Sequence, residues 1–156
     1  MSLFENMNNE EVRSLNLRDP VLVSPDDKLK NVIQAMRQQE LGCAILVDDE
    51  RKPVGMFTES MLTRLIATNP EAVNEPVRNH AADQWPQVQL PDPIVSVLEA
   101  LELKNVRFLS VVDEEGHIAG LTGQKGLMEY VADHFPSQVM VQRVGQSPSM
   151  QSREGA

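Results

Sequence analysis

The fold is decided by a stretch that occurs twice, CAILVDDERKPVG at residues 43–55 and FLSVVDEEGHIAG at residues 108–120. Each copy opens with a nearly continuous apolar run, continues into an acidic turn and ends at a glycine. The apolar run indicates a buried strand, and the acidic residues indicate the turn that reverses the chain. Because Gly55 and Gly120 are 65 residues apart, this spacing sets the register of an internal repeat.

The repeat extends well beyond these two stretches. Residues 9–67 align without a gap to residues 74–132, and fourteen of the 59 pairs are identical. About four identities would be expected by chance at this composition. The chain is therefore predicted to be a tandem duplication whose halves fold alike.

Each copy is predicted to have the order β-α-β-β-α, which gives a mixed α/β (α+β) fold class. A short strand with Val21 and Val23 leads to a helix capped by Asp27, and Asp92 is the expected cap in the second copy. Apolar residues at helical spacing follow each cap: Leu29, Val32, Ile33 and Met36, then Ile94, Val97, Leu98 and Leu101. The remaining strands are expected at residues 43–47, 54–57, 108–112 and 118–122, and one further helix ends each copy.

These patterns divide the chain into four segments. Residues 1–70 form the first unit with an N-terminal helix, and residues 71–76 form a linker with little apolar content. The second unit spans residues 77–135. Residues 136–156 are rich in Ser, Gln and Gly and are expected to be mostly flexible, although residues 139–141 can dock as a short strand.

Composition excludes several classes of protein. A net charge of -9 and a pI near 4.8 disfavour binding to nucleic acid. No apolar run approaches the roughly eighteen residues of a membrane span, and the N-terminus does not resemble a secretory signal, so a cytoplasmic protein is expected. The single cysteine, Cys43, is expected to be buried and inert. The three histidines lack metal-ligand spacing and no nucleophile motif is present, so the chain is not expected to be an enzyme.

The repeated unit resembles the cystathionine-beta-synthase (CBS) domain, and the duplication resembles the tandem pair called a Bateman module. The resemblance covers residues 9–135 and is carried by residues 18–27, 43–48 and 54–59. It implies two units packed sheet to sheet about a pseudo-two-fold axis, and association into homodimers. It also implies a stand-alone regulatory module that requires no cofactor. Such a module binds AMP, ATP or S-adenosylmethionine in the cleft between its repeats and modulates an unidentified protein target.

The family's binding signature, Gly-x-x-Ser/Thr-x-x-Asp, is only partly present. Gly55 and Thr58 match it, but Met61 occupies the position of the ribose-binding Asp. The second copy has Gly123 and Gly126 in place of the hydroxyl and the carboxylate. Loss of the carboxylate predicts ribose binding weakened about a hundredfold or more. The alternative function is therefore a degenerate pair that binds no small molecule and serves as a dimerisation or protein-interaction scaffold.

Two interpretations remain open for several of the candidate residues. The Thr58 hydroxyl can bind a ligand or cap its own helix. Arg18 can meet a phosphate or pair with Asp19 or another acid, and Lys125 can meet a phosphate or water. Trp85 can stack on a purine or close a core or a subunit interface. The candidate ligand-binding residues are Arg18, Leu22, Gly55, Phe57, Thr58, Trp85, Gly123 and Lys125.

Overall fold

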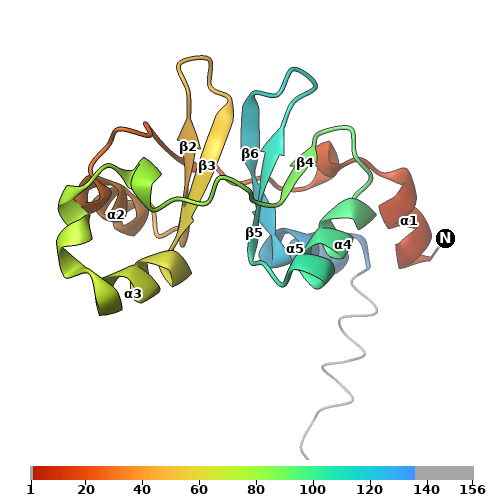
Figure 1. Ribbon diagram of the computed structural model, residues 1–156. Helices are drawn as coiled ribbons and strands as arrows, with labels where there is room; N and C mark the ends of the chain where they lie inside the picture. The colour runs from red at the N-terminus through yellow and green to blue at the C-terminus, as the bar shows by residue number, and fades with distance from the viewer. Residues whose placement is uncertain (1, 136–156) are drawn as a thin grey trace, which may run out of the picture.

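The computed structural model describes residues 2–135 and contains two similar α+β units whose sheets face each other (Figure 1). Each unit has a three-stranded sheet, in the order β1-β2-β3 in the first and β4-β5-β6 in the second. The predicted fold class is confirmed. The predicted C-terminal tail, with its short strand at residues 139–141, lies outside the described residues.

The first unit follows the predicted order. Strand β1 (Val21–Val23) leads through helix α2 (Leu29–Gln38) to β2 (Cys43–Val47), and these two strands are parallel. Strand β3 (Pro53–Thr58) returns antiparallel to β2, and helix α3 (Glu59–Thr68) ends the unit. Because a parallel pair needs a crossover, α2 supplies it and covers one face of the sheet with its apolar stripe.

The second unit repeats this arrangement 65 residues later. It consists of β4 (Gln87–Gln89), α4 (Val95–Lys104), β5 (Phe108–Val112), β6 (Ile118–Gly123) and α5 (Gln124–His134). The strand register is the same, since Leu22 pairs with Ile45 as Gln87 pairs with Ser110. Left-handed backbone also repeats at one equivalent pair, with φ of 53° at Glu40 and 47° at Asn105. The duplication therefore extends to backbone conformation.

The predicted helix caps are wrong at both Asp27 and Asp92. Helix α2 begins at Leu29 after Lys28, and α4 begins at Val95 after Ile94. Each aspartate instead accepts a backbone N–H from the residue three positions earlier, Ser24 at 2.9 Å and Gln89 at 2.8 Å. The carboxylates close the turn between strand and helix, because these nearer donors satisfy them first.

The leading segments of the two repeats are exchanged. Helix α1 (Leu3–Asn9) and the 3₁₀ turn η1 (Val12–Ser14) pack in the core of the second unit, beside α4 in Figure 1. The 3₁₀ turns η2 (Pro70–Asn74) and η3 (Val77–Asn79) pack instead on the first unit, where Ala72 and Val77 are fully buried. The boundaries 1–70, 71–76 and 77–135 remain a prediction about domain division, and this packing crosses them.

Equivalent hydrogen bonds fix the two exchanged segments. The Val12 N–H donates to the Asp92 carbonyl at 2.8 Å, and the Val77 N–H donates to the Asp27 carbonyl at 2.8 Å. Val77 is the repeat equivalent of Val12, and Asp27 is the equivalent of Asp92. The segment that precedes each unit therefore forms part of the core of the other unit.

A third apolar cluster lies between the two sheets. Cys43, Ile45 and Met56 from the first unit pack against Ile118 and Leu121 from the second. The outer edges of the sheets are paired as well, since Met56 exchanges two backbone hydrogen bonds with Ala82, and Leu121 exchanges two with Arg18. These contacts cover sheet edges that would otherwise expose unpaired backbone groups. The predicted sheet-to-sheet packing is thereby confirmed.

Candidate functional site

Two pockets lie between the repeats, one at the beginning of each final helix. The first, which we call the basic pocket, has a volume of about 340 Å³ and is lined by the start of α5 together with residues of both units. The second, which we call the apolar pocket, has a volume of about 320 Å³ and is lined by the start of α3 and by residues 82–86. Both volumes fall within the range of small-molecule sites.

The two pockets are repeat equivalents of each other. Residues 121–126 line the basic pocket, and their equivalents at 56–61, apart from Phe57, line the apolar pocket. Residues 40–42 and 105–107 stand in the same relation. Differences between the pockets therefore reflect substitutions on a shared backbone.

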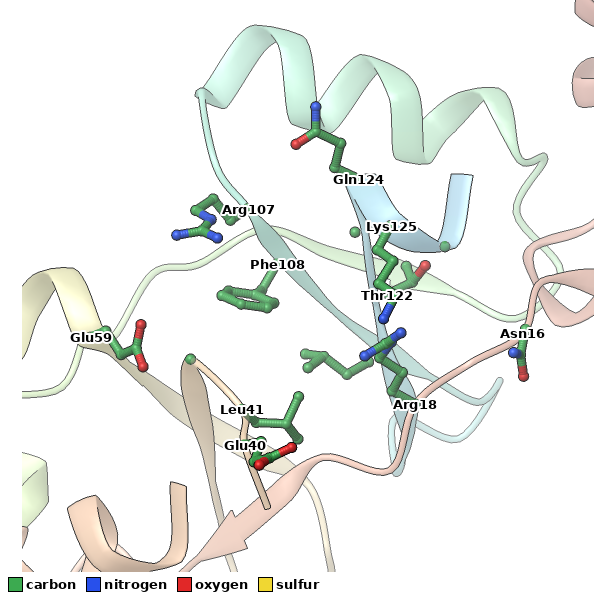
Figure 2. A pocket seen from close by; sticks show the side chains of 14 residues that line it. Asn16, Arg18, Glu40, Leu41, Glu59, Arg107, Phe108, Thr122, Gln124 and Lys125 are labelled. Carbon is green, nitrogen blue, oxygen red and sulfur yellow. The ribbon is translucent and has the colours of Figure 1, made fainter. Parts of the chain in front are cut away.

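Three cations line the basic pocket, namely Arg18, Arg107 and Lys125, together with two acids, Glu40 and Glu59 (Figure 2). The equivalents of Arg107 and Lys125 in the other repeat are Gly42 and Ser60, so much of this charge is particular to the second copy. N–H groups at the start of α5 also favour anions. The basic pocket is thus suited to an anionic group.

Arg18 pairs with an acid, as one of its two interpretations predicted, and the acid is Glu129. The Arg18 Nη2 atom lies 3.4 Å from Glu129 Oε1, with side-chain exposures of 40% and 33%. Such a half-exposed pair contributes little to stability. Arg18 also lines the basic pocket, so it remains within reach of a ligand.

The close backbone approach at Gly123 explains why the second copy lacks the signature hydroxyl. A Cβ atom at Gly123 would lie 2.2 Å from the Arg107 carbonyl oxygen, which no side chain can tolerate. A Cβ atom at Gly126 would lie 2.6 Å from Thr122 Oγ1. Thr122 is 4% exposed, and its hydroxyl has no hydrogen-bond partner within residues 2–135.

The apolar pocket contains Thr58 and Trp85 from the candidate set. The Thr58 hydroxyl accepts the Met61 N–H at 3.3 Å, so it caps α3 as one interpretation predicted. The Trp85 indole N–H donates to Ser110 Oγ at 2.8 Å, and the side chain packs against the cluster between the sheets. Trp85 therefore closes a core and lines the pocket at the same time.

Three candidate residues line neither pocket. Phe57 is fully buried in the core of the first unit, and Leu22 packs against the cluster between the sheets. A Cβ atom at Gly55 would lie 3.2 Å from the Ala82 carbonyl oxygen, so this glycine permits the segment from the second repeat to approach. The structure thus brings together Thr58 and Trp85 in the apolar pocket, and places Arg18, Gly123 and Lys125 together in the basic pocket.

Sequence reasoning missed Arg107 and Thr122. Arg107 is the repeat equivalent of Gly42. A charged residue in one repeat at a position that is glycine in the other repeat is a sequence signal for a functional residue. Thr122 lies two residues after Gly120, whereas the signature specifies only the third and sixth positions after its glycine. Its position in the basic pocket depends on how the two repeats face each other, which spacing alone does not reveal.

Other kinds of site find no support in the part of the chain that the structure describes. Cys43 is 1% exposed, and burial, followed by the nearby Glu59 carboxylate, raises the pKa of its thiol to about 12. Across residues 2–135, no cluster of three or more His, Cys, Asp or Glu side chains could hold a metal ion. Over the same residues, no helix has the length and apolar character required to cross a bilayer.

Comparison with known proteins finds a similarity to one family over part of the chain. The CBS domain family model matches residues 12–68. The ATP-binding protein OpuCA for glycine betaine, carnitine and choline transport from Bacillus subtilis is 26% identical over 124 residues, which cover 80% of this chain and 31% of that protein. An uncharacterized Methanopyrus kandleri protein is 23% identical over 79% of this chain and 63% of its own length. The chain thus spans less than two thirds of these two relatives.

Solved structures share the whole fold. A CBS domain protein from Pyrobaculum aerophilum complexed with AMP has a TM-score of 0.71 at 20% identity, over 87% of this chain and 99% of that one. A CBS domain pair in complex with 5-methylthioadenosine and S-adenosyl-L-methionine has a TM-score of 0.70 at 14% identity, over 80% of this chain and 97% of that one. At such identities the likeness concerns the fold alone.

Proposed function

We propose that this chain, which is a tandem CBS-domain pair, is a regulatory module that binds an adenosine-type nucleotide in the cleft between its repeats and modulates a separate partner. The observation that carries the proposal is the pair of equivalent pockets between the repeats, one of which holds Arg18, Arg107 and Lys125. A chain with a net charge of -9 that gathers three cations in one pocket has a local preference for anions.

Two related folds support adenosine-type ligands. The Pyrobaculum aerophilum protein is complexed with AMP, and another CBS domain pair is in complex with two adenosine compounds. In this chain Trp85 offers an aromatic surface to a base, and it does so beside Thr58, the part of the binding signature that is retained. We propose that Met61 lowers affinity here, because a thioether is a poor acceptor for ribose hydroxyls.

Thermal-shift and calorimetric titrations with AMP, ATP, NADH and S-adenosylmethionine test this proposal. A specific ligand stabilises the folded state increasingly as its concentration rises above Kd, so the Tm should climb throughout the titration. Lys125→Ala should reduce the shift, whereas Lys30→Ala, an exposed lysine on α2 that lines neither pocket, should leave it unchanged. Absence of any shift at millimolar concentrations of all four ligands would refute nucleotide sensing.

The second candidate function is a homodimeric or heteromeric scaffold, and exposed apolar side chains favour it. Ile66 on α3, Leu103 on α4 and Met128 on α5 are 42%, 85% and 65% exposed. Large exposed apolar side chains on several helices are typical of an interaction surface. We propose a homodimer through these helices, in a cytoplasmic setting where adenine nucleotides are available.

Light scattering coupled to size-exclusion chromatography measures the assembly directly. A dimer should elute with twice the chain mass of 17.4 kDa, and Leu103→Glu or Met128→Glu should shift it towards the monomer, since a buried unpaired charge opposes association. A monomeric mass at high micromolar concentration would exclude the homodimer.

A further inference from the structure

The two pockets share a common wall. Gly42, Glu59, Arg107 and Phe108 line both of them. A Cβ atom at position 42 would lie 3.1 Å from Phe108 Cζ, so the aromatic ring rests directly on the glycine backbone. Figure 2 shows Phe108 drawn between Arg107 and Arg18 on the side of the basic pocket. The two cavities are therefore neighbours that share these lining residues.

The lining of the two pockets has diverged in complementary directions. The basic pocket has Lys125 and Gly126 where the apolar pocket has Ser60 and Met61. The apolar pocket also contains Met56, Trp85 and Pro86. Its own cation, Arg64, is held by Ser60 Oγ at 3.1 Å on the same helix. One pocket thus suits a planar apolar group and the other suits an anion.

Arg107 can serve both pockets because it lies in their shared wall. It is exposed, and residues 2–135 contain no acid within ion-pair distance of its guanidinium. Lys125 and Arg18 line the basic pocket together with Arg107. Thr122, whose buried hydroxyl lacks a partner in the same part of the chain, also lines the basic pocket.

We propose that the two pockets are halves of one composite site for a single ligand, which has a planar ring at one end and a polyanionic group at the other. The ring occupies the apolar pocket beside Trp85 and Met61. The anionic group passes Arg107 and ends at Lys125 and Arg18. The inference rests on the proposed function and sharpens it, because it replaces two equivalent sites by one ligand per chain and names a nucleoside polyphosphate as the matching chemical class.

Calorimetry of the full chain with ATP, adenosine and inorganic triphosphate tests the composite site. ATP should bind with a stoichiometry of one per chain. Lys125→Ala should weaken ATP and triphosphate about tenfold, the effect of losing one charge-assisted contact, and should leave adenosine unchanged. Met61→Ala should weaken ATP and adenosine but not triphosphate. Adenosine and triphosphate should bind together, and ATP should displace both.

The outcomes separate this inference from the proposed function. Two ATP molecules per chain, or adenosine that competes with triphosphate, would overturn the composite site and leave nucleotide sensing intact. An affinity for ATP that is unchanged in the Lys125→Ala variant would also overturn the composite site. Failure of ATP to bind at millimolar concentration would overturn the composite site, and failure of AMP, NADH and S-adenosylmethionine as well would overturn the proposed function. Lys30→Ala is the matched control for charge and should bind all three probes as the unaltered chain does.

Discussion

At the scale of single residues, the Thr122 hydroxyl is a buried polar group without a partner in the part of the chain that the structure describes. Its side chain is 4% exposed in strand β6, and its hydroxyl is one of two buried side-chain groups without a hydrogen-bond partner within residues 2–135. An unpaired buried hydroxyl costs folding free energy, and proteins retain such groups mainly where a ligand or water completes them. Thr122 therefore combines an unsatisfied hydroxyl with a position in the lining of the basic pocket.

Replacing this hydroxyl by a methyl group should stabilise the folded protein. Thr122→Val keeps the shape and the β-branching, so the free energy of unfolding should rise by about 1 kcal/mol in a urea titration. Thr122→Ser is the control, because it retains the hydroxyl, removes the methyl group and should destabilise. A loss of stability in the valine variant would show that the hydroxyl already has a partner, such as an ordered water.

The buried thiol of Cys43 should make stability depend on alkaline pH. Its pKa is raised from 9.0 to about 12, first by burial and then by the Glu59 carboxylate. Between these pH values the folded state keeps a proton that the unfolded state has lost, so stability is fully present below pH 9 and falls as pH rises towards 12.

Two measurements check this behaviour. Labelling of Cys43 at pH 8 should be very slow in the native protein and rapid in urea, since the thiolate is the reactive species. The decline in unfolding free energy above pH 9 should be shallower in Cys43→Ala than in the unaltered chain. Rapid labelling of the native protein would show that the thiol is accessible.

Glu59 should limit the affinity of the composite site for anions. Glu59 lines both pockets, as Arg107 does. Glu59→Gln should tighten ATP binding about three- to fivefold in calorimetry, the effect of removing one nearby like charge at high dielectric. Glu102→Gln, an exposed position on α4 that lines neither pocket, should have no effect. Weaker binding by the Glu59→Gln variant would indicate that the carboxylate accepts a hydrogen bond from the ligand.

At the scale of elements, the two final helices start differently although their backbones are equivalent. Thr58 caps α3 with its hydroxyl, whereas Gly123 leaves α5 without a side-chain cap. The reason is the Arg107 carbonyl, which occupies the space that a side chain at Gly123 would need. The start of α5 thus keeps its N–H groups available towards the basic pocket.

Removal of the α3 cap should cost measurable stability. Thr58→Ala should lower the free energy of unfolding by about 1 kcal/mol in urea, because it removes the acceptor for the Met61 N–H. Thr58→Ser is the matched control and should stay close to the unaltered chain. Equal destabilisation by both variants would assign the effect to the methyl group and its packing rather than to the cap.

The strands and helices could be predicted because both copies carry the same periodicities at the same spacing. The caps at Asp27 and Asp92 could not, since their carboxylates have two sets of donors and the path of the turn selects the nearer one. Arg107 and Thr122 escaped prediction for a related reason. Their position in the basic pocket depends on how the two repeats face each other, which the pattern within one repeat does not specify.

At the scale of the whole molecule, exchange of the leading segments couples the repeats. Met7 belongs to the first 70 residues, yet it is 5% exposed within the core of the second unit, and Val77 is fully buried within the core of the first. A unit cut from the chain at the linker would lose part of its core. The two pockets between the repeats consequently sit on a scaffold whose halves stabilise each other.

The exchange of the leading segments predicts which of the two units each core mutation destabilises. Met7→Ala should lower stability by about 2–5 kcal/mol, through lost burial and a cavity, and should speed amide exchange in α4 and α5 more than in α2. Val77→Ala is the mirror control and should speed exchange in α2 more than in α5, because Val77 packs against the first unit. If Met7→Ala instead loosened α2 first, the leading segment would belong to its own repeat. An equal loss of amide protection in both units would mean that the two units unfold only together. The exchanged segments would then make unfolding of the whole molecule cooperative.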